Sequence, residues 1–209
     1  MKGSVYIGVS LDGFIAREDG DIEWLEEFGD EEAIPAYEEF ITKIDAFVIG
    51  RGTFEKILTF PSWPYNLDAF LLSTTIKQLP AIVEGKITLL SMKPKEVMTY
   101  LSDKGYTNSY IDGGKVIQGF LNEDLIDELI ISKLPILIGS GIPLFGHLDH
   151  DLRFTHIKTE VHKNGIVRSH YERKRKDAEE ERKDAEEERK DAEEERKVAK
   201  EKLANKSNH

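Results

Sequence analysis

A pair of glycines between an apolar strand and a helix is the pattern in this chain that best fits ligand binding. In IDGGKVIQGFL, Gly113 and Gly114 follow the apolar Ile111, and Val116 and Ile117 begin a helical spacing of apolar residues. Two glycines let the backbone turn sharply and approach a ligand closely. The free N–H groups of the next helical turn favour an anion, and phosphate is the natural ligand. The same residues also fit an ordinary turn, so the choice depends on what lies beside them.

A second strand, glycine turn and helix occupies residues 46–58 and carries an arginine in its turn. Gly50, Arg51, Gly52 and Thr53 separate the apolar AFVI run from apolar residues at helical spacing. A guanidinium in such a turn can fork onto a phosphate. The alternative is a surface arginine on a loop between a strand and a helix.

Polar side chains follow two further strands. Ser73 and Thr74 come after the apolar residues 69–72. Their hydroxyls can bond phosphate or ribose, or they can cap the next turn. Asp12 follows residues 5–9 and precedes a glycine, so its carboxylate either lies at the edge of a site or belongs only to a turn.

The elements that must position these residues read as an α/β fold with a mainly parallel sheet. The strand-like runs are almost continuously apolar, as expected for strands buried on both faces. A helix is predicted from Asp30, its cap, with one apolar face, and another helix from Pro94. The residues of the first apolar face are Ile34, Tyr37, Phe40, Ile41 and Ile44.

Asn164-Gly165 lies between two strand-like runs, residues 154–161 and 166–171, and predicts an antiparallel C-terminal hairpin. Ligands of parallel α/β sheets bind at the carboxyl ends of the strands. The polar and glycine residues that follow strand ends are therefore expected to gather at one edge of the sheet. They are Asp12, Arg51, Ser73 and Gly113.

Composition divides the chain into a body, residues 1–171, and a charged helical extension, residues 172–209. The body has the length of one globular domain. The extension holds three copies of DAEEERK in residues 177–197, with one alanine per repeat as its apolar position. A coiled coil needs two apolar positions per heptad, so we expect a solvated helix; a weak oligomerisation role is the alternative.

Charge and residue usage exclude several classes of function. The formal net charge is −11, which argues against a nucleic-acid surface. The chain has no cysteine, and hence no disulfide, thiol nucleophile or Cys-based metal site, and we expect no metal. It has no hydrophobic signal core and no apolar run long enough to span a bilayer. We expect a cytoplasmic protein that acts on a small molecule and has no membrane or nucleic-acid partner.

The segments VSLDGFIA, FVIGRGTFE, LLST and YIDGGKVIQGFL followed by LIDELIISKLPILIGSGIPLF resemble the dihydrofolate reductase fold. More narrowly, they resemble the reductase domain of bacterial riboflavin-biosynthesis proteins and its stand-alone relatives. The resemblance covers nearly all of residues 1–171. It implies a three-layer α/β/α domain with a mainly parallel central sheet and the antiparallel C-terminal hairpin.

The same resemblance implies that NADPH is the cofactor, so that the nicotinamide supplies the redox chemistry. It places Arg51 at the 2′-phosphate, with Ser73 and Thr74 assisting there. The residues that it assigns to the adenosine phosphate end are Gly50, Arg51, Gly52 and Thr53, and those that it assigns to the pyrophosphate are Gly113, Gly114, Lys115 and Val116.

One departure concerns the substrate. Dihydrofolate reductases carry an acidic residue on their first long helix, and Ala36 lies near the matching position here. The neighbouring Glu32 and Glu39 fall on other sides of the predicted helix. Asp12, in the SLDG segment, is therefore the first candidate for substrate binding or proton transfer.

These expectations together describe an NADPH-dependent oxidoreductase that reduces a small pterin- or pyrimidine-like substrate, as 5-amino-6-(5-phosphoribosylamino)uracil reductases do. The alternatives are a weak dihydrofolate reductase and a non-catalytic NADPH-binding protein. The resemblance and the apolar C-terminal strands also predict a homodimer.

Overall fold

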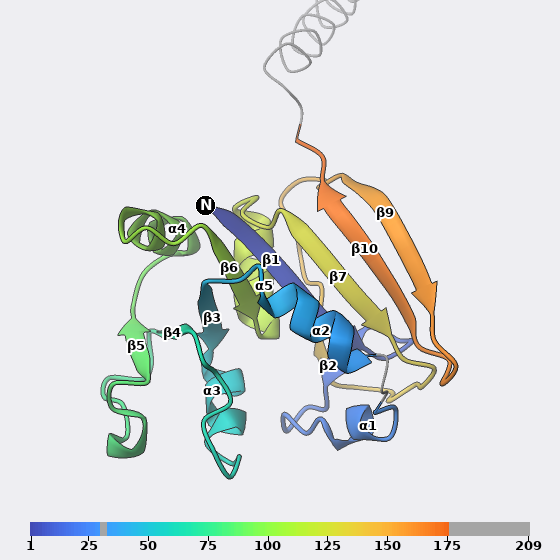
Figure 1. Ribbon diagram of the computed structural model, residues 1–209, viewed down its shortest axis with the longest axis horizontal. Helices are drawn as coiled ribbons and strands as arrows, with labels where there is room; N and C mark the ends of the chain where they lie inside the picture. Colours follow the sequence, from blue (N-terminus) through green and yellow to red (C-terminus); the bar gives the residue numbers. More distant parts are fainter. Residues whose placement is uncertain (30–32, 176–209) are drawn as a thin grey trace, which may run out of the picture. The chain divides into compact units, whose positions relative to one another are not determined.

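The computed structural model describes residues 1–29 and 33–175, and these ranges contain an eight-stranded sheet (Figure 1). Pairing is parallel from β5 through to β7, whereas β10 is antiparallel to both β7 and β9. The predicted parallel sheet with an antiparallel C-terminal hairpin is therefore confirmed. In spatial order the strands are β5 (Ile87–Leu90), β4 (Asp68–Leu72), β3 (Ala46–Gly50), β6 (Asn108–Asp112), β1 (Lys2–Val9), β7 (Glu128–Lys133), β10 (Val167–Arg173) and β9 (Phe154–Val161).

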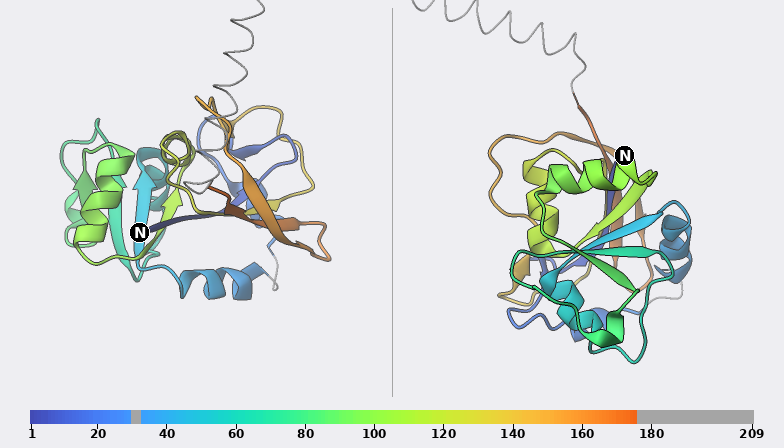
Figure 2. Two further views of the ribbon diagram at one scale, coloured as in Figure 1. Left: turned by 90° about the horizontal axis from the view of Figure 1, so that it is seen from above. Right: turned by 90° about the vertical axis from the view of Figure 1, so that its left-hand side faces the viewer.

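Helices cover both faces of the sheet, as the views in Figure 2 show. On one face α2 (Ala33–Ile41) and α3 (Arg51–Ile57) bury side chains against β3, β4 and β6. On the other face α4 (Pro94–Asp103) and α5 (Gly114–Asn122) pack on β1, β3 and β6. Successive strand residues point to opposite faces, which gives each helical layer its own core.

Smaller elements surround this sheet. A short pair of strands, β2 (Phe14–Ala16) and β8 (Ile142–Pro143), forms a second sheet. A 3-10 turn, η1 (Ala81–Val83), precedes β5. The helix α1 (Glu23–Glu26) was not among the predicted elements, because a single turn is too short to show a helical period.

The predicted apolar face of the first long helix is correct only in part. Phe40 and Ile44 are buried, although Ile44 lies beyond the helix end at Ile41. Ile34, in contrast, is 61% exposed. Periodicity identifies the side of a helix that faces a sheet, but not how far the sheet extends beneath it. The predicted cap, Asp30, lies outside the described residues.

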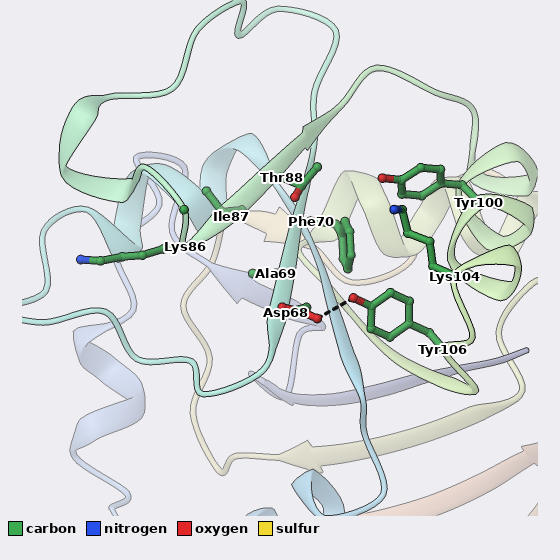
Figure 3. A pocket seen from close by; sticks show the side chains of 10 residues that line it. Asp68, Ala69, Phe70, Lys86, Ile87, Thr88, Tyr100, Lys104 and Tyr106 are labelled. Carbon is green, nitrogen blue, oxygen red and sulfur yellow. Dashed lines mark hydrogen bonds between the residues drawn. The ribbon is translucent and has the colours of Figure 1, made fainter.

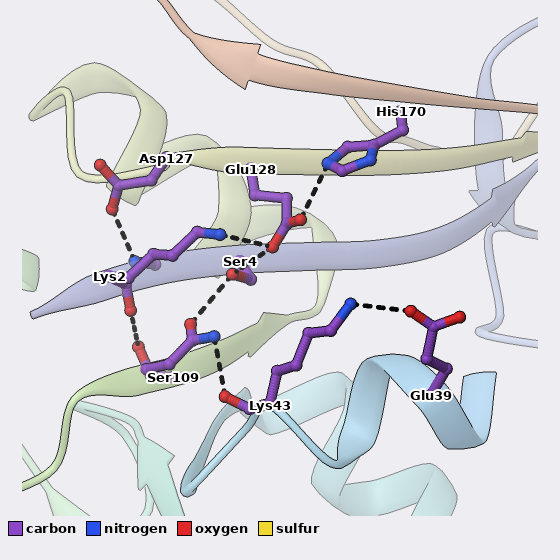
Figure 4. Close-up of polar contacts among 10 residues, drawn as sticks. Lys2, Ser4, Glu39, Lys43, Ser109, Asp127, Glu128 and His170 are labelled. Carbon is purple, nitrogen blue, oxygen red and sulfur yellow. Dashed lines mark hydrogen bonds and ion pairs between the residues drawn. The ribbon is translucent and has the colours of Figure 1, made fainter. Parts of the chain in front are cut away.

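Buried polar contacts tie β1, β7 and β10 together near the start of β7 (Figure 4). Glu128 accepts a hydrogen bond from Ser4 Oγ at 2.9 Å, and its carboxylate lies 3.0 Å from Lys2 Nζ and 2.8 Å from His170 Nε2. Burial raises the pKa of Glu128, but Lys2, Ser4 and His170 together lower that pKa below its usual value. The network therefore stabilises an ionised carboxylate inside the sheet.

Met1–Arg173 form one compact unit. The three DAEEERK copies, and with them the predicted solvated helix, lie outside the described residues. Within the ranges described, no helix is both long enough and apolar enough to cross a membrane.

Candidate functional site

The two glycine turns predicted from the sequence lie against each other at the carboxyl ends of β3 and β6. A Cβ atom on Gly113 would lie 2.7 Å from Thr53 Oγ1, and Gly113 has a φ of 97°. A Cβ atom on Gly50 would lie 2.8 Å from Val116 Cγ2. The starts of α3 and α5 therefore approach each other so closely that only glycine fits both positions. The backbones of the two turns form one side of the candidate site.

The small second sheet lies over the start of α5. A Cβ atom on Gly114 would lie 3.0 Å from Ile142 Cγ2 on β8 and 3.2 Å from Ile15 Cδ1 on β2. Apolar side chains thus border the glycine turns on one side. A planar heterocycle could rest on such a border while its phosphates meet the backbone N–H groups.

Two cations lie on this edge of the sheet at solvent-exposed positions. Arg51 begins α3, and its Nε lies 3.6 Å from Glu55 Oε1 in an exposed ion pair. Such an exposed ion pair contributes little to stability. The guanidinium can therefore exchange Glu55 for a phosphate. Lys115, in the first turn of α5, is also exposed.

The hydroxyl of Ser73 is engaged in its own turn. Ser73 Oγ accepts hydrogen bonds from the N–H groups of Thr75, at 3.3 Å, and Ile76, at 3.1 Å. This geometry matches the turn-capping alternative for Ser73. Thr74 is exposed at the same strand end, and its carbonyl accepts a hydrogen bond from Lys77 Nζ at 2.7 Å.

Asp12 lies at the same edge but holds a loop. Ser10 Oγ donates to Asp12 Oδ1 at 2.5 Å, and the Gly139 N–H donates to Asp12 Oδ2 at 2.8 Å. A longer bond of 3.3 Å comes from the Ile138 N–H. The Ser10 hydroxyl, ahead of these backbone donors, lowers the pKa of Asp12. The carboxylate is therefore held in its ionised form.

Asp112 ends β6 directly before the glycine pair, and its pKa is raised, whereas that of Asp12 is lowered. Burial raises the pKa of Asp112 to about 6, although hydrogen bonds from the Gly113 N–H and the Thr53 hydroxyl act against this rise. Sequence reasoning missed this residue. The available signal was a carboxylate ending an apolar strand immediately before two glycines.

Aromatic side chains surround Asp112 on the face that α2 covers. Burial raises the pKa values of Tyr37 and Tyr65, and the charge of Asp112 adds to both shifts. Tyr6 packs against Tyr37 with ring centroids 5.5 Å apart, and the Tyr110 hydroxyl donates to the Tyr6 carbonyl at 2.6 Å. The arrangement provides a ring-lined surface beside a carboxyl that is partly protonated near pH 6.

The described part of α2 adds no buried carboxylate to this surface. Ala36 is partly buried, whereas Glu38 and Glu39 are exposed. Glu39 lies 2.9 Å from Lys43 Nζ in an ion pair one turn along. Glu32 lies outside the described residues.

A separate hollow of about 190 Å³ lies at the opposite edge, where β4 and β5 begin (Figure 3). There the Tyr106 hydroxyl donates to Asp68 Oδ2 at 2.5 Å, and Lys104 Nζ lies 5.0 Å from the centre of the Tyr100 ring. This hollow contains none of the predicted site residues. The described ranges also contain no cluster of three or more side chains suited to a metal ion.

Comparison with known proteins gives a consistent family. The family model described as the RibD C-terminal domain matches residues 68–168. The uncharacterized protein YwjB of Bacillus subtilis (strain 168) is 35% identical over 175 residues, which are 82% of this chain and 98% of that protein.

Solved structures agree. A putative riboflavin biosynthesis protein from Shewanella sp. PV-4 is 40% identical with a TM-score of 0.79, over 84% of this chain and 100% of that one. A dihydrofolate reductase from Enterococcus faecalis is 17% identical with a TM-score of 0.62, over 83% of this chain and 97% of that one. The second likeness shows a shared fold.

Proposed function

Because the chain belongs to the RibD C-terminal domain family, we propose that it is an NADPH-dependent reductase of a small pterin- or pyrimidine-like substrate. The relative from Shewanella is a putative riboflavin biosynthesis protein, and the dihydrofolate reductase of the same fold is complexed with NADP(H). The observation that carries the proposal is the contact between the two glycine turns, with Asp112 beside it.

The residues at the turns fit a dinucleotide cofactor. The close approach of Gly50 and Gly113 leaves backbone N–H groups near the start of α5, where a pyrophosphate is favoured. Arg51 is exposed and weakly paired, as a 2′-phosphate ligand should be. We assign the adenosine phosphate end to Gly50, Arg51, Gly52, Thr53, Ser73 and Thr74, and the pyrophosphate to Gly113, Gly114, Lys115 and Val116. Ser73 contributes there by shaping its turn.

We assign the proton donor to Asp112. The cofactor supplies a hydride, and the reduced substrate then needs a proton. A pKa of about 6 keeps part of the Asp112 carboxyl protonated near neutral pH. The Thr53 hydroxyl and Gly113 N–H fix its position at the cofactor turn. Asp12, the first candidate from the sequence, is held ionised, and we assign it a positioning role for the 138–139 loop.

The alternatives make distinct predictions. A weak dihydrofolate reductase would oxidise NADPH with dihydrofolate, although the described part of α2 offers no buried carboxylate to a pteridine. A non-catalytic binding protein would bind NADPH but leave it unoxidised with every substrate. Both outcomes appear in one assay with a panel of pterins and pyrimidines, including 5-amino-6-(5-phosphoribosylamino)uracil.

Asp112→Asn tests the mechanism in the same assay. With a substrate that supports turnover, we expect kcat to fall by roughly 10² or more, as for a lost general acid. The affinity for NADPH should change little, because only the proton is removed. Asp12→Asn is the matched control and should keep most of its kcat. If Asp12→Asn loses kcat and Asp112→Asn keeps it, the two roles are reversed.

A further inference from the structure

The hollow where β4 and β5 begin is separate from the glycine turns, which lie at the opposite edge of the sheet (Figure 3). Its volume is about 190 Å³. Pockets for drug-sized ligands begin at roughly 300 Å³, so a ligand of this hollow is small. NADPH bound at the glycine turns would leave the hollow open.

Three aromatic rings border the hollow. The ring of Phe70 meets the ring of Tyr106 edge to face, with centroids 5.5 Å apart and an angle of 78°. It meets the ring of Tyr100 in the same way, at 6.3 Å and 81°. Phe70 is only 3% exposed, so its ring is held in place by the core. Rings at right angles offer both edges and faces to a further ring, and aromatic pairs favour these arrangements.

The one carboxylate that lines the hollow already has a partner within the protein. The Tyr106 hydroxyl donates a hydrogen bond to Asp68 Oδ2 at 2.5 Å. This hydrogen bond, ahead of burial, raises the pKa of Tyr106 to about 12. Tyr106 therefore keeps its proton at neutral pH and remains a donor to Asp68, so Asp68 does not require a cationic ligand.

Lys104, in contrast, has no counterion. Its Nζ lies 5.0 Å from the centre of the Tyr100 ring, and within the described ranges no carboxylate oxygen lies within 4.0 Å of it. In Figure 3 the ammonium group lies between the two tyrosines and faces Phe70, whereas Lys86 extends away from the hollow. The dipole of α4 favours a cation at this end of the helix, but it does not account for an ammonium group directed into the hollow.

We propose that this hollow binds a small planar ring that carries one acidic group. The ring packs against Phe70 and the two tyrosines, and the acidic group pairs with Lys104. Thr88, which is next to Phe70 in register and also lines the hollow, provides a hydroxyl for the same group. The site is independent of the proposed reductase function.

The test follows the amide signals of Thr88 and Lys104 in two-dimensional NMR of the full chain during titration with benzoate. These signals report on the hollow even if benzoate also binds elsewhere. We expect benzoate to shift both signals in the wild type. In Lys104→Met the dissociation constant should rise roughly tenfold, as for a lost charge-assisted hydrogen bond; the amide of Thr88 reports it. Lys95→Met is the matched control, because Lys95 is an exposed lysine on the same helix that does not line the hollow.

Two further probes and one variant separate the ring from the charge. Cyclohexanecarboxylate keeps the charge without an aromatic ring, and benzylammonium keeps the ring with the opposite charge, so both should bind more weakly than benzoate. Tyr100→Leu removes one ring of the wall and should also weaken benzoate binding.

The proposal is overturned if benzoate leaves both signals unchanged in the wild type, if Lys104→Met binds benzoate as tightly as Lys95→Met does, or if benzylammonium binds as tightly as benzoate. None of these results bears on the reductase, because NADPH titration of the same proteins tests the glycine turns separately.

Discussion

Asp12 follows β1 and Asp112 ends the neighbouring strand β6 at the same edge of the sheet, yet the pKa values of the two carboxyls shift in opposite directions. The Ser10 hydroxyl and two backbone N–H groups lower the pKa of Asp12, whose side chain is exposed. Burial raises the pKa of Asp112 to about 6. Two carboxylates in different surroundings can thus take different roles, one as a fixed charge and the other as a proton donor.

The raised pKa of Asp112 predicts a pH-dependent effect on stability. Well below pH 3.8 the carboxyl is neutral in both the folded and the unfolded state. As the pH rises from there through about 6, the free energy of unfolding falls, because the carboxyl ionises more easily in the unfolded chain. A pKa raised from 3.8 to about 6 corresponds to about 3 kcal/mol at most. We therefore expect Asp112→Asn to be more stable than the wild type by about 1 to 3 kcal/mol at pH 8.

Urea unfolding of both proteins at pH 3 and pH 8 measures this difference. It should become small at pH 3, below the unfolded pKa of 3.8, where the wild-type carboxyl is mostly protonated in both states. A difference that is equal at both pH values would show that Asp112 is not buried in the way described.

The sequence alone identified residues that follow strand ends but not their surroundings. Gly113 and Gly50 were found because glycine before a helix is a local signal. Asp112 was missed because its pKa depends on its burial in the folded protein, which residue spacing does not show. The capping role of Ser73 was open because either use of the hydroxyl fits the same letters.

At the scale of elements, Gly50 and Gly52 at the start of α3 are glycine for different reasons. A Cβ on Gly50 would lie 2.8 Å from Val116 Cγ2, whereas a Cβ on Gly52 would meet nothing within 4 Å. Packing inside the protein therefore requires glycine at position 50 but not at position 52. A cofactor that approaches the turn closely would explain why position 52 is glycine.

Gly50→Ala and Gly52→Ala form a matched pair that separates packing from cofactor contact. Gly50→Ala should lower stability by about 1 to 3 kcal/mol through overpacking. Gly52→Ala lies in α3 and should raise stability by about 0.5 to 1 kcal/mol. Its affinity for NADPH should nevertheless fall at least roughly tenfold. A Gly52→Ala protein with normal NADPH affinity would remove Gly52 from the proposed cofactor site.

Most strands and helices could be predicted from the sequence because their signals are local. The expected runs 87–90 and 154–161 match β5 and β9. The spatial order of the strands was not predicted, since β1 pairs with β6 and β7, which lie more than a hundred residues away. Such pairing depends on how helices cover both faces of the sheet rather than on any short segment.

At the scale of the whole molecule, β9 is an edge strand with exposed apolar side chains. Val161 is 76% exposed and Ile157 is 46% exposed. An edge of this kind favours association with another chain. We propose that the protein is a homodimer that buries this strand.

The double variant Ile157→Lys and Val161→Lys should shift the full chain to a monomer in sedimentation velocity. Ile82→Lys is the control, because Ile82 is 73% exposed at η1, before the opposite edge strand β5, and should leave the dimer intact. A wild type that sediments as a monomer would contradict the proposal.

The central claim is that the paired glycine turns bind NADPH, and direct titration of the full chain with NADPH and NADH tests it. We predict that NADPH binds more tightly than NADH, because we assign Arg51 to the 2′-phosphate. Arg51→Ala should remove most of this preference, roughly tenfold or more, while Arg153→Ala keeps it. Failure of the wild type to bind either cofactor would contradict the account, and equal losses for NADPH and NADH in Arg51→Ala would contradict the role of Arg51.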